Sequence, residues 1–315
     1  MKKWLIGIFA IIILFLISCQ IFIPQNIIVV KSVIAKANLN GVYRFLSSDS
    51  NWIKWWPEKF SASSESAMAL PESGGFQFIK TKLGYNSLEI VIKKDKKTTP
   101  SLLHLASLGN DSIRIEWNIT MHSSNNPLSK IIHYLDSRNL SRRLASILAA
   151  MQNHISQVKH IYGVEIRKEK IKLEFLVSRR IKISHYPTNE DIYGMINEIK
   201  KHLEQKEVKE AAYPIFNIEP SGANDFLLLV AVPVSKPLKD EGNFTTLKLL
   251  KNGDILVTEV NGGQAAVDNA LKQMKIYAAD HQHLNVALPY QIFLTDRTKV
   301  KDTSKWLTQI SYPYI

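Results

Sequence analysis

Few residues in this chain of 315 have the types and spacing that enzyme chemistry requires. His281 and His283 form the segment HQH, but two imidazoles alone make an incomplete metal site, so we expect an ordinary loop before LNVALPY. The only cysteine, Cys19, lies in an apolar N-terminal segment, which excludes a cysteine nucleophile from the rest of the chain. The sequence contains no Gly-rich phosphate loop, no His-Glu-x-x-His and no Gly-x-Ser-x-Gly motif. We therefore assign no catalytic residue, no metal and no cofactor, and the sequence favours a binding protein over an enzyme.

Aromatic residues are the stronger chemical signal, and they are concentrated in NWIKWWPEKF, residues 51 to 60. Trp52, Trp55 and Trp56 offer large, stiff apolar surfaces that either fill a core or line a pocket. We expect Trp56 to lie at the surface, where tryptophan suits a membrane interface. The segment SIRIEWNI alternates apolar and polar residues, which predicts a strand with Trp117 on its apolar face. In this part of the chain, the candidate ligand-binding residues are Trp52, Trp55 and Trp117.

The N-terminus predicts attachment to a membrane. About 20 uncharged, mostly apolar residues run from Trp4 to Ile23, a length that spans a bilayer as a helix. The lysines at positions 2 and 3 favour a cytoplasmic N-terminus and place the remaining chain on the extracytoplasmic side. The alternative is a lipoprotein signal, because Cys19 ends the segment LISC after an apolar run. Either arrangement holds residues 26 to 315 at a membrane.

The charge of the chain agrees with a membrane as partner. The sequence has 40 basic and 28 acidic residues, a formal net charge of +12. An excess of this size suits an anionic membrane surface or a nucleic acid. The lysines are scattered, and no recognition helix or helix-turn-helix accompanies them. We therefore expect no binding to nucleic acid.

Residues 26 to 160 have the element order of a curved sheet that packs on a long helix. NIIVVKSVIA and SLEIVI predict strands, and Asn126 and Pro127 predict the start of a long amphipathic helix. This order, together with VVKSVIAKANLNGVYRFLSSDSNWIKWW, resembles the SRPBCC family (START-like, polyketide cyclase-like). The resemblance implies a helix-grip fold with an apolar cavity between sheet and helix. It does not imply an enzyme.

Residues 161 to 315 contain a duplication. One copy runs from RRIKISHYPTNEDIYGMINEIKKHL to LLLVAVPVS, and the other from GDILVTEVNGGQAAVDNALKQM to ISYPY. Each copy reads as strand, helix, strand, strand. Tyr213 and Phe216 of the first copy fall near the places that Tyr290 and Phe293 have in the second, and VAVPV matches ISYPY. The pattern predicts two related units with an α+β fold.

The duplicated unit, with its segments PYQIFLTD and WLTQISYP, resembles the GyrI-like domain, the effector-binding domain of AraC- and MerR-type regulators. The resemblance implies a ligand cleft between the two related sheets. In that family the cleft is lined by aromatic residues and often contains a carboxylate that meets cationic, lipophilic drugs. On this chain the resemblance assigns ligand binding to Tyr213, Tyr290, Phe293, Trp306 and Gln309.

The family pattern changes at Gln309, where many members have Glu. A buried carboxylate attracts an organic cation strongly, whereas an amide offers only hydrogen bonds. The change favours a neutral ligand, although aromatic faces alone hold a cation more weakly. Glu259, on the strand before NGG, is a possible source of a carboxylate, but we expect it to be exposed.

We thus predict an α+β protein with three parts: a membrane anchor at residues 1 to 25, a helix-grip domain at 26 to 160, and a GyrI-like domain at 161 to 315. The expected function is membrane-tethered binding of small lipophilic or amphipathic molecules. Two alternatives stay open: a hydrolase or cyclase that acts on a lipophilic substrate, and a scaffold that grips a partner protein. The sequence does not identify the ligand, a protein partner or the oligomeric state.

Overall fold

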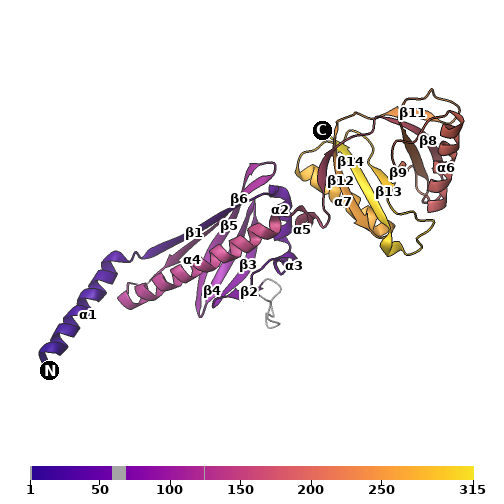
Figure 1. Ribbon diagram of the computed structural model, residues 1–315. Coiled ribbons are helices and arrows are strands. Elements are labelled where there is room, and N and C mark those ends of the chain that lie inside the picture. Colours follow the sequence, from indigo (N-terminus) through magenta and orange to yellow (C-terminus); the bar gives the residue numbers. More distant parts are fainter. Residues whose placement is uncertain (1, 59–68, 124) are drawn as a thin grey trace. The chain divides into compact units, whose positions relative to one another are not determined.

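The computed structural model describes residues 2–58, 69–123 and 125–315 (Figure 1). The chain divides into two compact units, residues 1–161 and residues 162–315. Each unit contains one antiparallel sheet together with helices. The predicted α+β class is therefore confirmed.

Helix α1 (Lys2–Phe22) covers most of the segment predicted as a membrane span. Its large apolar side chains are exposed, among them Trp4, Leu14 and Phe22. Over the part of the chain that the structure describes, no helix is both long enough and apolar enough to cross a membrane. The predicted span is thus unconfirmed.

The first unit is built on a six-stranded sheet in the order β1-β6-β5-β4-β3-β2. The first strand of the chain pairs with the last strand of this sheet, so that Val29 lies opposite Ile119. The predicted strands at NIIVVKSVIA, SLEIVI and SIRIEWNI correspond to β1, β4 and β6. The strands have these bounds: β1 (Asn26–Ala35), β2 (Ala69–Ser73), β3 (Phe76–Gly84), β4 (Ser87–Lys94), β5 (Lys97–Gly109) and β6 (Ser112–His122).

One face of this sheet is covered by the long helix α4 (Pro127–Ile155) (Figure 1). Asn126 caps the helix by accepting a hydrogen bond from the Leu128 N–H, and Pro127 occupies the first turn, as the sequence predicted. The apolar stripe of α4, including Leu144, Ile147 and Met151, is fully buried in the core of the first unit. The described residues of the unit also form three short helices, α2 (Leu39–Ser47), α3 (Asp49–Trp52) and α5 (Val158–Tyr162), the last of which lies at the unit boundary.

The second unit consists of two halves with the same order of elements. The first half is β8 (Phe175–Ile183), α6 (Asn189–Gln205), β9 (Ile215–Pro220) and β10 (Phe226–Val234). The second half is β12 (Asp254–Asn261), α7 (Gln264–Asp280), β13 (Tyr290–Phe293) and β14 (Leu307–Tyr314), with a short 3₁₀ helix, η1 (Thr303–Lys305), before β14. The halves join in one eight-stranded sheet, β11-β8-β10-β9-β13-β14-β12-β7, where Phe216 of β9 pairs with Gln291 of β13.

The halves are also joined by exchanged strands. Strand β7 (Arg167–Lys170) precedes the first half in the chain but pairs with β12 of the second half. Strand β11 (Thr245–Lys248) precedes the second half but pairs with β8 of the first. Between these ladders the two crossing segments are hydrogen-bonded to each other, from Ile171 N–H to the Gly253 carbonyl and from Leu249 N–H to the Glu174 carbonyl.

The sheet of the second unit has apolar residues on both faces. Val177, Phe216 and Val230 pack beneath α6 with the apolar face of that helix. Their sequence neighbours Leu176, Ile215 and Ala231 belong to a separate core cluster, because successive side chains of a strand point to opposite faces. We call these the helix side and the inner side of the sheet.

Candidate functional site

The tryptophan turn of the first unit lies in the core. Trp52, Trp55 and Trp56 are at most 6% exposed, and neighbouring ring centroids lie 4.9 to 6.0 Å apart. The expectation that Trp56 lies at the surface is wrong, because its ring packs edge-on against Phe78 of β3 at 5.3 Å. The adjoining Pro57 is exposed instead. Phe78 in turn packs against the predicted site residue Trp117, which is fully buried.

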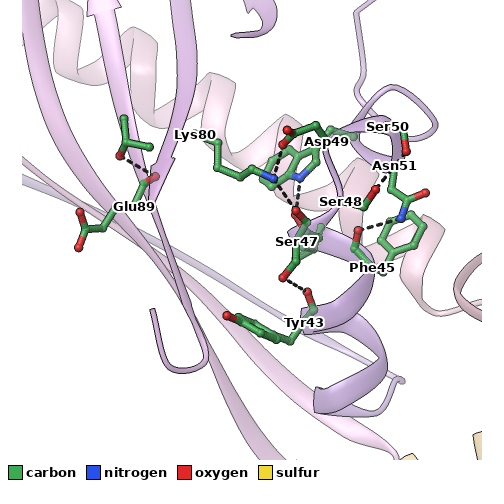
Figure 2. Close-up of polar contacts among 12 residues, drawn as sticks. Tyr43, Phe45, Ser47, Ser48, Asp49, Ser50, Asn51, Lys80 and Glu89 are labelled. Carbon is green, nitrogen blue, oxygen red and sulfur yellow. Dashed lines mark hydrogen bonds and ion pairs between the residues drawn. The ribbon is translucent and has the colours of Figure 1, made fainter. Parts of the chain in front are cut away.

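The turn also completes the end of helix α2. The last carbonyls of a helix lack partners within it. Three side chains supply these partners, as Figure 2 shows in part: Asn51 donates to the Phe45 carbonyl (2.9 Å), the Trp52 indole N–H to the Leu46 carbonyl (2.6 Å), and Lys80 to the Ser47 carbonyl (2.7 Å). Lys80 is buried and also forms an ion pair with Asp49. These contacts support a structural role for Trp52.

A hollow of about 380 Å³ lies elsewhere in the first unit, between the sheet and α4. Its apolar walls include Phe76, Ile92 and Met121, and four of its polar residues form two pairs. Lys94 is paired with Asp136, and the ammonium group of Lys97 contacts Nε2 of His133. Burial, followed by the charge of Lys97, lowers the pKa of His133. None of the three tryptophans predicted as ligand-binding in this unit, Trp52, Trp55 and Trp117, is among the residues described around this hollow.

The second unit contains a larger hollow on the helix side of its sheet, about 570 Å³ in volume. We call it the helix-side hollow. It contains two of the predicted site residues, Tyr213 and Phe293, and Phe216, whose ring packs against that of Phe293 at 4.5 Å. The remaining lining residues come from α6, from the segment before β9 and from the segment after β13: Tyr193, Ile196, Asn197, Lys200, Pro214, Leu294, Asp296 and Thr298.

Tyr290 belongs to a different hollow, of about 280 Å³, on the inner side of the same sheet. Its neighbours there include Leu176, Ile215 and Leu249. Burial raises the pKa of the Tyr290 phenol. The predicted aromatic pair Tyr290 and Phe293 is therefore divided between two cavities. The two residues are an odd number of positions apart on one strand, so their side chains point to opposite faces of the sheet.

Gln309 and Glu259 lie opposite each other on β14 and β12. Gln309 is partly buried, and its amide donates to the Ser311 hydroxyl at 3.4 Å. Glu259 is exposed, as expected, and accepts a hydrogen bond from Arg167 at 2.9 Å. Neither residue is among those described around the helix-side hollow.

The remaining predicted residue, Trp306, packs against an arginine that the sequence did not single out. The Arg297 guanidinium carbon lies 4.5 Å from the centre of the Trp306 ring and 3.6 Å from that of Phe293. Arg297 is 8% exposed, and its guanidinium donates to the Asn189 side chain (3.2 Å) and to the Thr308 hydroxyl (2.6 Å). Trp306 donates its own N–H to the Val300 carbonyl at 2.7 Å.

Arg297 carries a charge that burial disfavours. Burial lowers its pKa to about 10, so the guanidinium remains protonated at neutral pH. Its neighbours Asn189 and Thr308 are uncharged, and the Nε atom has no hydrogen-bond partner among the described residues. This burial has no signal in the sequence, because TDRTKV reads as a polar loop, and only the folded chain shows that the arginine is covered.

The lining of the helix-side hollow suits binding. It combines aromatic rings with a small number of hydroxyl, amide and charged groups, which is the usual composition of a small-molecule site. His281, in contrast, is buried and stacks on Tyr277 of α7 at 3.9 Å. Within the described residues, no group of three or more metal-ligating side chains is present.

No family model matches this sequence, and no curated protein matches it. Among solved structures, the chain is similar to the EcmrR C-terminal domain, with 13% identity over 48% of this chain and 98% of that one and a TM-score of 0.41. It is similar to SAV2435 bound to tetraphenylphosphonium, with 15% identity over 48% and 94% of the two chains and a TM-score of 0.32. It is also similar to the di-domain ARO/CYC BexL, with 9% identity over 92% of this chain and 85% of that one and a TM-score of 0.34. Likenesses this weak assign neither a family nor a function.

Proposed function

We propose that this protein binds small lipophilic or amphipathic molecules, and that the helix-side hollow of the second unit is the binding site. The observation that carries the proposal is the hollow itself, whose volume of about 570 Å³ is in the range of small-molecule sites. Tyr193, Phe216 and Phe293 give it aromatic walls, and Asn197 and Thr298 give it hydrogen-bonding groups. The hollow beside α4 is a second, smaller binding site in this proposal.

The proposal includes the two family assignments. A six-stranded antiparallel sheet with one long helix on its face agrees with a helix-grip domain of the SRPBCC kind. Two halves of equal element order within one sheet agree with a GyrI-like domain. Both kinds of domain are ligand holders, so each assignment supports binding of a guest molecule.

A blocked hollow provides the test. Asn197 lies on the exposed part of α6 and lines the hollow, so Asn197→Trp fills it without disturbing the core. Lys201→Trp, on the same helix but outside the hollow, is the matched control. We expect the full-length protein in phosphatidylcholine nanodiscs to bind the neutral probe Nile red more strongly than empty nanodiscs do. Asn197→Trp should lower the affinity for Nile red at least tenfold, and Lys201→Trp should not change it.

Native ligand provides a second readout. Mass spectrometry of the purified wild-type protein should find a lipophilic molecule that is missing from Asn197→Trp and present in Lys201→Trp. Absence of both probe binding and a copurified molecule would refute the proposal. Hydrolysis of a lipophilic ester that Asn197→Trp abolishes would instead favour the hydrolase alternative.

We also propose that the N-terminal segment holds the protein at a membrane, with the rest of the chain on the extracytoplasmic side. The exposed apolar side chains of α1 support attachment to lipid, because so many exposed apolar groups are unfavourable in water. Cell fractionation tests the attachment. Mass spectrometry of the N-terminal peptide distinguishes a retained helix, which begins before Trp4, from a chain that begins at a lipid-modified Cys19. Recovery of an unmodified full-length chain in the aqueous fraction would refute both forms.

A further inference from the structure

Arg297 stands out in the second unit as a buried cation without an acidic partner among the described residues. The other charged groups near the helix-side hollow are neutralised: Lys200 pairs with Glu210 at 2.9 Å, and Asp296 pairs with Lys299 at 3.1 Å. Arg297 has only neutral acceptors, and its Nε–H has none. A buried donor left without an acceptor is unfavourable, and more so when it is charged. The protein thus keeps an unmet donor in a covered position.

This guanidinium lies next to the hollow. Phe293 lines the hollow with its ring and contacts Arg297, whose guanidinium carbon lies 3.6 Å from the ring centre. Asp296 and Thr298, the sequence neighbours of Arg297, also line the hollow. Tyr193 lines it as well, and its hydroxyl accepts a hydrogen bond from the Arg297 backbone N–H at 3.0 Å. The phenol keeps its own proton to donate. Arg297 is not itself a lining residue, but Phe293, Tyr193, Asp296 and Thr298, which contact it or adjoin it in the chain, all line the hollow.

The carboxylate of Asp296 is the group that would favour a cationic guest. It is exposed and already accepts hydrogen bonds from the backbone and the hydroxyl of Thr298, and these bonds lower its pKa. The negative charge of Asp296 is therefore already stabilised by groups at the protein surface. The positive charge of Arg297 is buried and stronger at short range, since screening by water is weak there.

We propose that the guest of the helix-side hollow has an anionic head group, a carboxylate, sulfonate or phosphate, which Arg297 and Tyr193 bind while the aromatic walls hold an apolar tail. This inference rests on the proposed function and specifies the chemical class of the guest. A planar guanidinium is well suited to such oxyanions, and charged hydrogen bonds are the stronger ones.

Three probes with the same tail test the head group: dodecanoate, dodecanol and dodecyltrimethylammonium. Each displaces Nile red from the full-length protein in nanodiscs, and acetate without a tail is the fourth probe. We expect dodecanoate to bind at least tenfold more tightly than the other three. Arg297→Gln should reduce dodecanoate affinity about tenfold to a hundredfold and leave dodecanol within twofold. Lys301→Gln, which removes one positive charge from an exposed residue outside the hollow, should change neither.

The outcomes separate the two proposals. If none of the three tailed probes binds, the proposed function and the anionic guest are both refuted. If the tailed probes bind equally, or if Arg297→Gln preserves their order, the hollow binds lipophiles and the anionic head group is refuted. If acetate binds as tightly as dodecanoate, Arg297 binds a free anion and the amphiphile is refuted. Retained dodecanol binding would show that Arg297→Gln is folded. If that variant unfolds, Arg297→Lys replaces it, and this variant must still lower the affinity for dodecanoate more than the affinity for dodecanol.

Discussion

Two tryptophans of one turn should differ sharply in what their indole N–H groups contribute to stability. Trp52 and Trp55 are both buried, and their ring centroids are 4.9 Å apart. The N–H of Trp52 donates to the Leu46 carbonyl at 2.6 Å, whereas that of Trp55 has no partner among the described residues. Replacement of either residue by Phe keeps an aromatic ring and removes the N–H.

The structure sets the magnitude of the difference. Both replacements leave a similar void, which costs about 1–2 kcal/mol of unfolding free energy. Trp52→Phe additionally leaves the Leu46 carbonyl without its partner, a further cost of about 1–3 kcal/mol. Trp55→Phe breaks no described hydrogen bond and removes a buried donor that was unpaired. We therefore expect Trp52→Phe to be the more destabilising of the two by about 1–3 kcal/mol.

Urea denaturation of the full-length variants, monitored by hydrogen exchange and mass spectrometry, measures the stability of each unit separately. Peptides from residues 39 to 56 should lose protection in Trp52→Phe, while peptides from residues 175 to 234 provide an internal control and should not change. Equal destabilisation by the two variants would contradict the role given to the Trp52 hydrogen bond. A larger effect of Trp55→Phe would contradict it more strongly.

Three further predictions concern titration and helix caps. Burial, followed by the neighbouring charges of His160 and Lys54, lowers the pKa of His154 to about 4. As the pH falls, the unfolded chain binds this proton before the folded chain does, so acid destabilises the folded state. The unfolding free energy of the first unit should fall by about 1–2 kcal/mol between about pH 6.5 and about pH 4, since His154 is only partly buried. In urea titrations, His154→Gln should make the unfolding free energy depend less on pH over this range. Asn38→Ala removes the cap of α2, and its denaturation midpoint should indicate a loss of about 1–2 kcal/mol. Thr188→Ala and Asp191→Asn each break the capping box of α6, so each should cost about 1 kcal/mol, and the double variant should cost less than their sum.

The sequence predicted the repeating elements of this fold well, because their signals are local. The alternation in SIRIEWNI gave β6, and the pair Asn126 and Pro127 gave the start of α4. It predicted the surface position of Trp56 wrongly, since the packing of that ring depends on Phe78, more than twenty residues away in the chain. Contacts of that kind have no pattern in a single segment.

The candidate site was predictable only in its residue types. Tyr213 and Phe293 do line one hollow, but Tyr290 lies on the inner side of the sheet and Trp306 covers Arg297. Tyr290 and Phe293 are three positions apart on β13, so they point to opposite faces of the sheet in any register. Arg297 itself comes from a loop, where neither periodicity nor composition indicates burial.

The exchange of β7 and β11 restricts how the second unit can move and be divided. A clamshell opening of the two halves would break both of the exchanged ladders together with the crossing bonds near Ile171. Exposed residues such as Tyr213 and Asn197 line the helix-side hollow, so a molecule of the proposed kind would enter it with the sheet intact. A chain truncated before β11 would also expose the edge of β8, so an isolated half would aggregate where the paired halves remain dispersed.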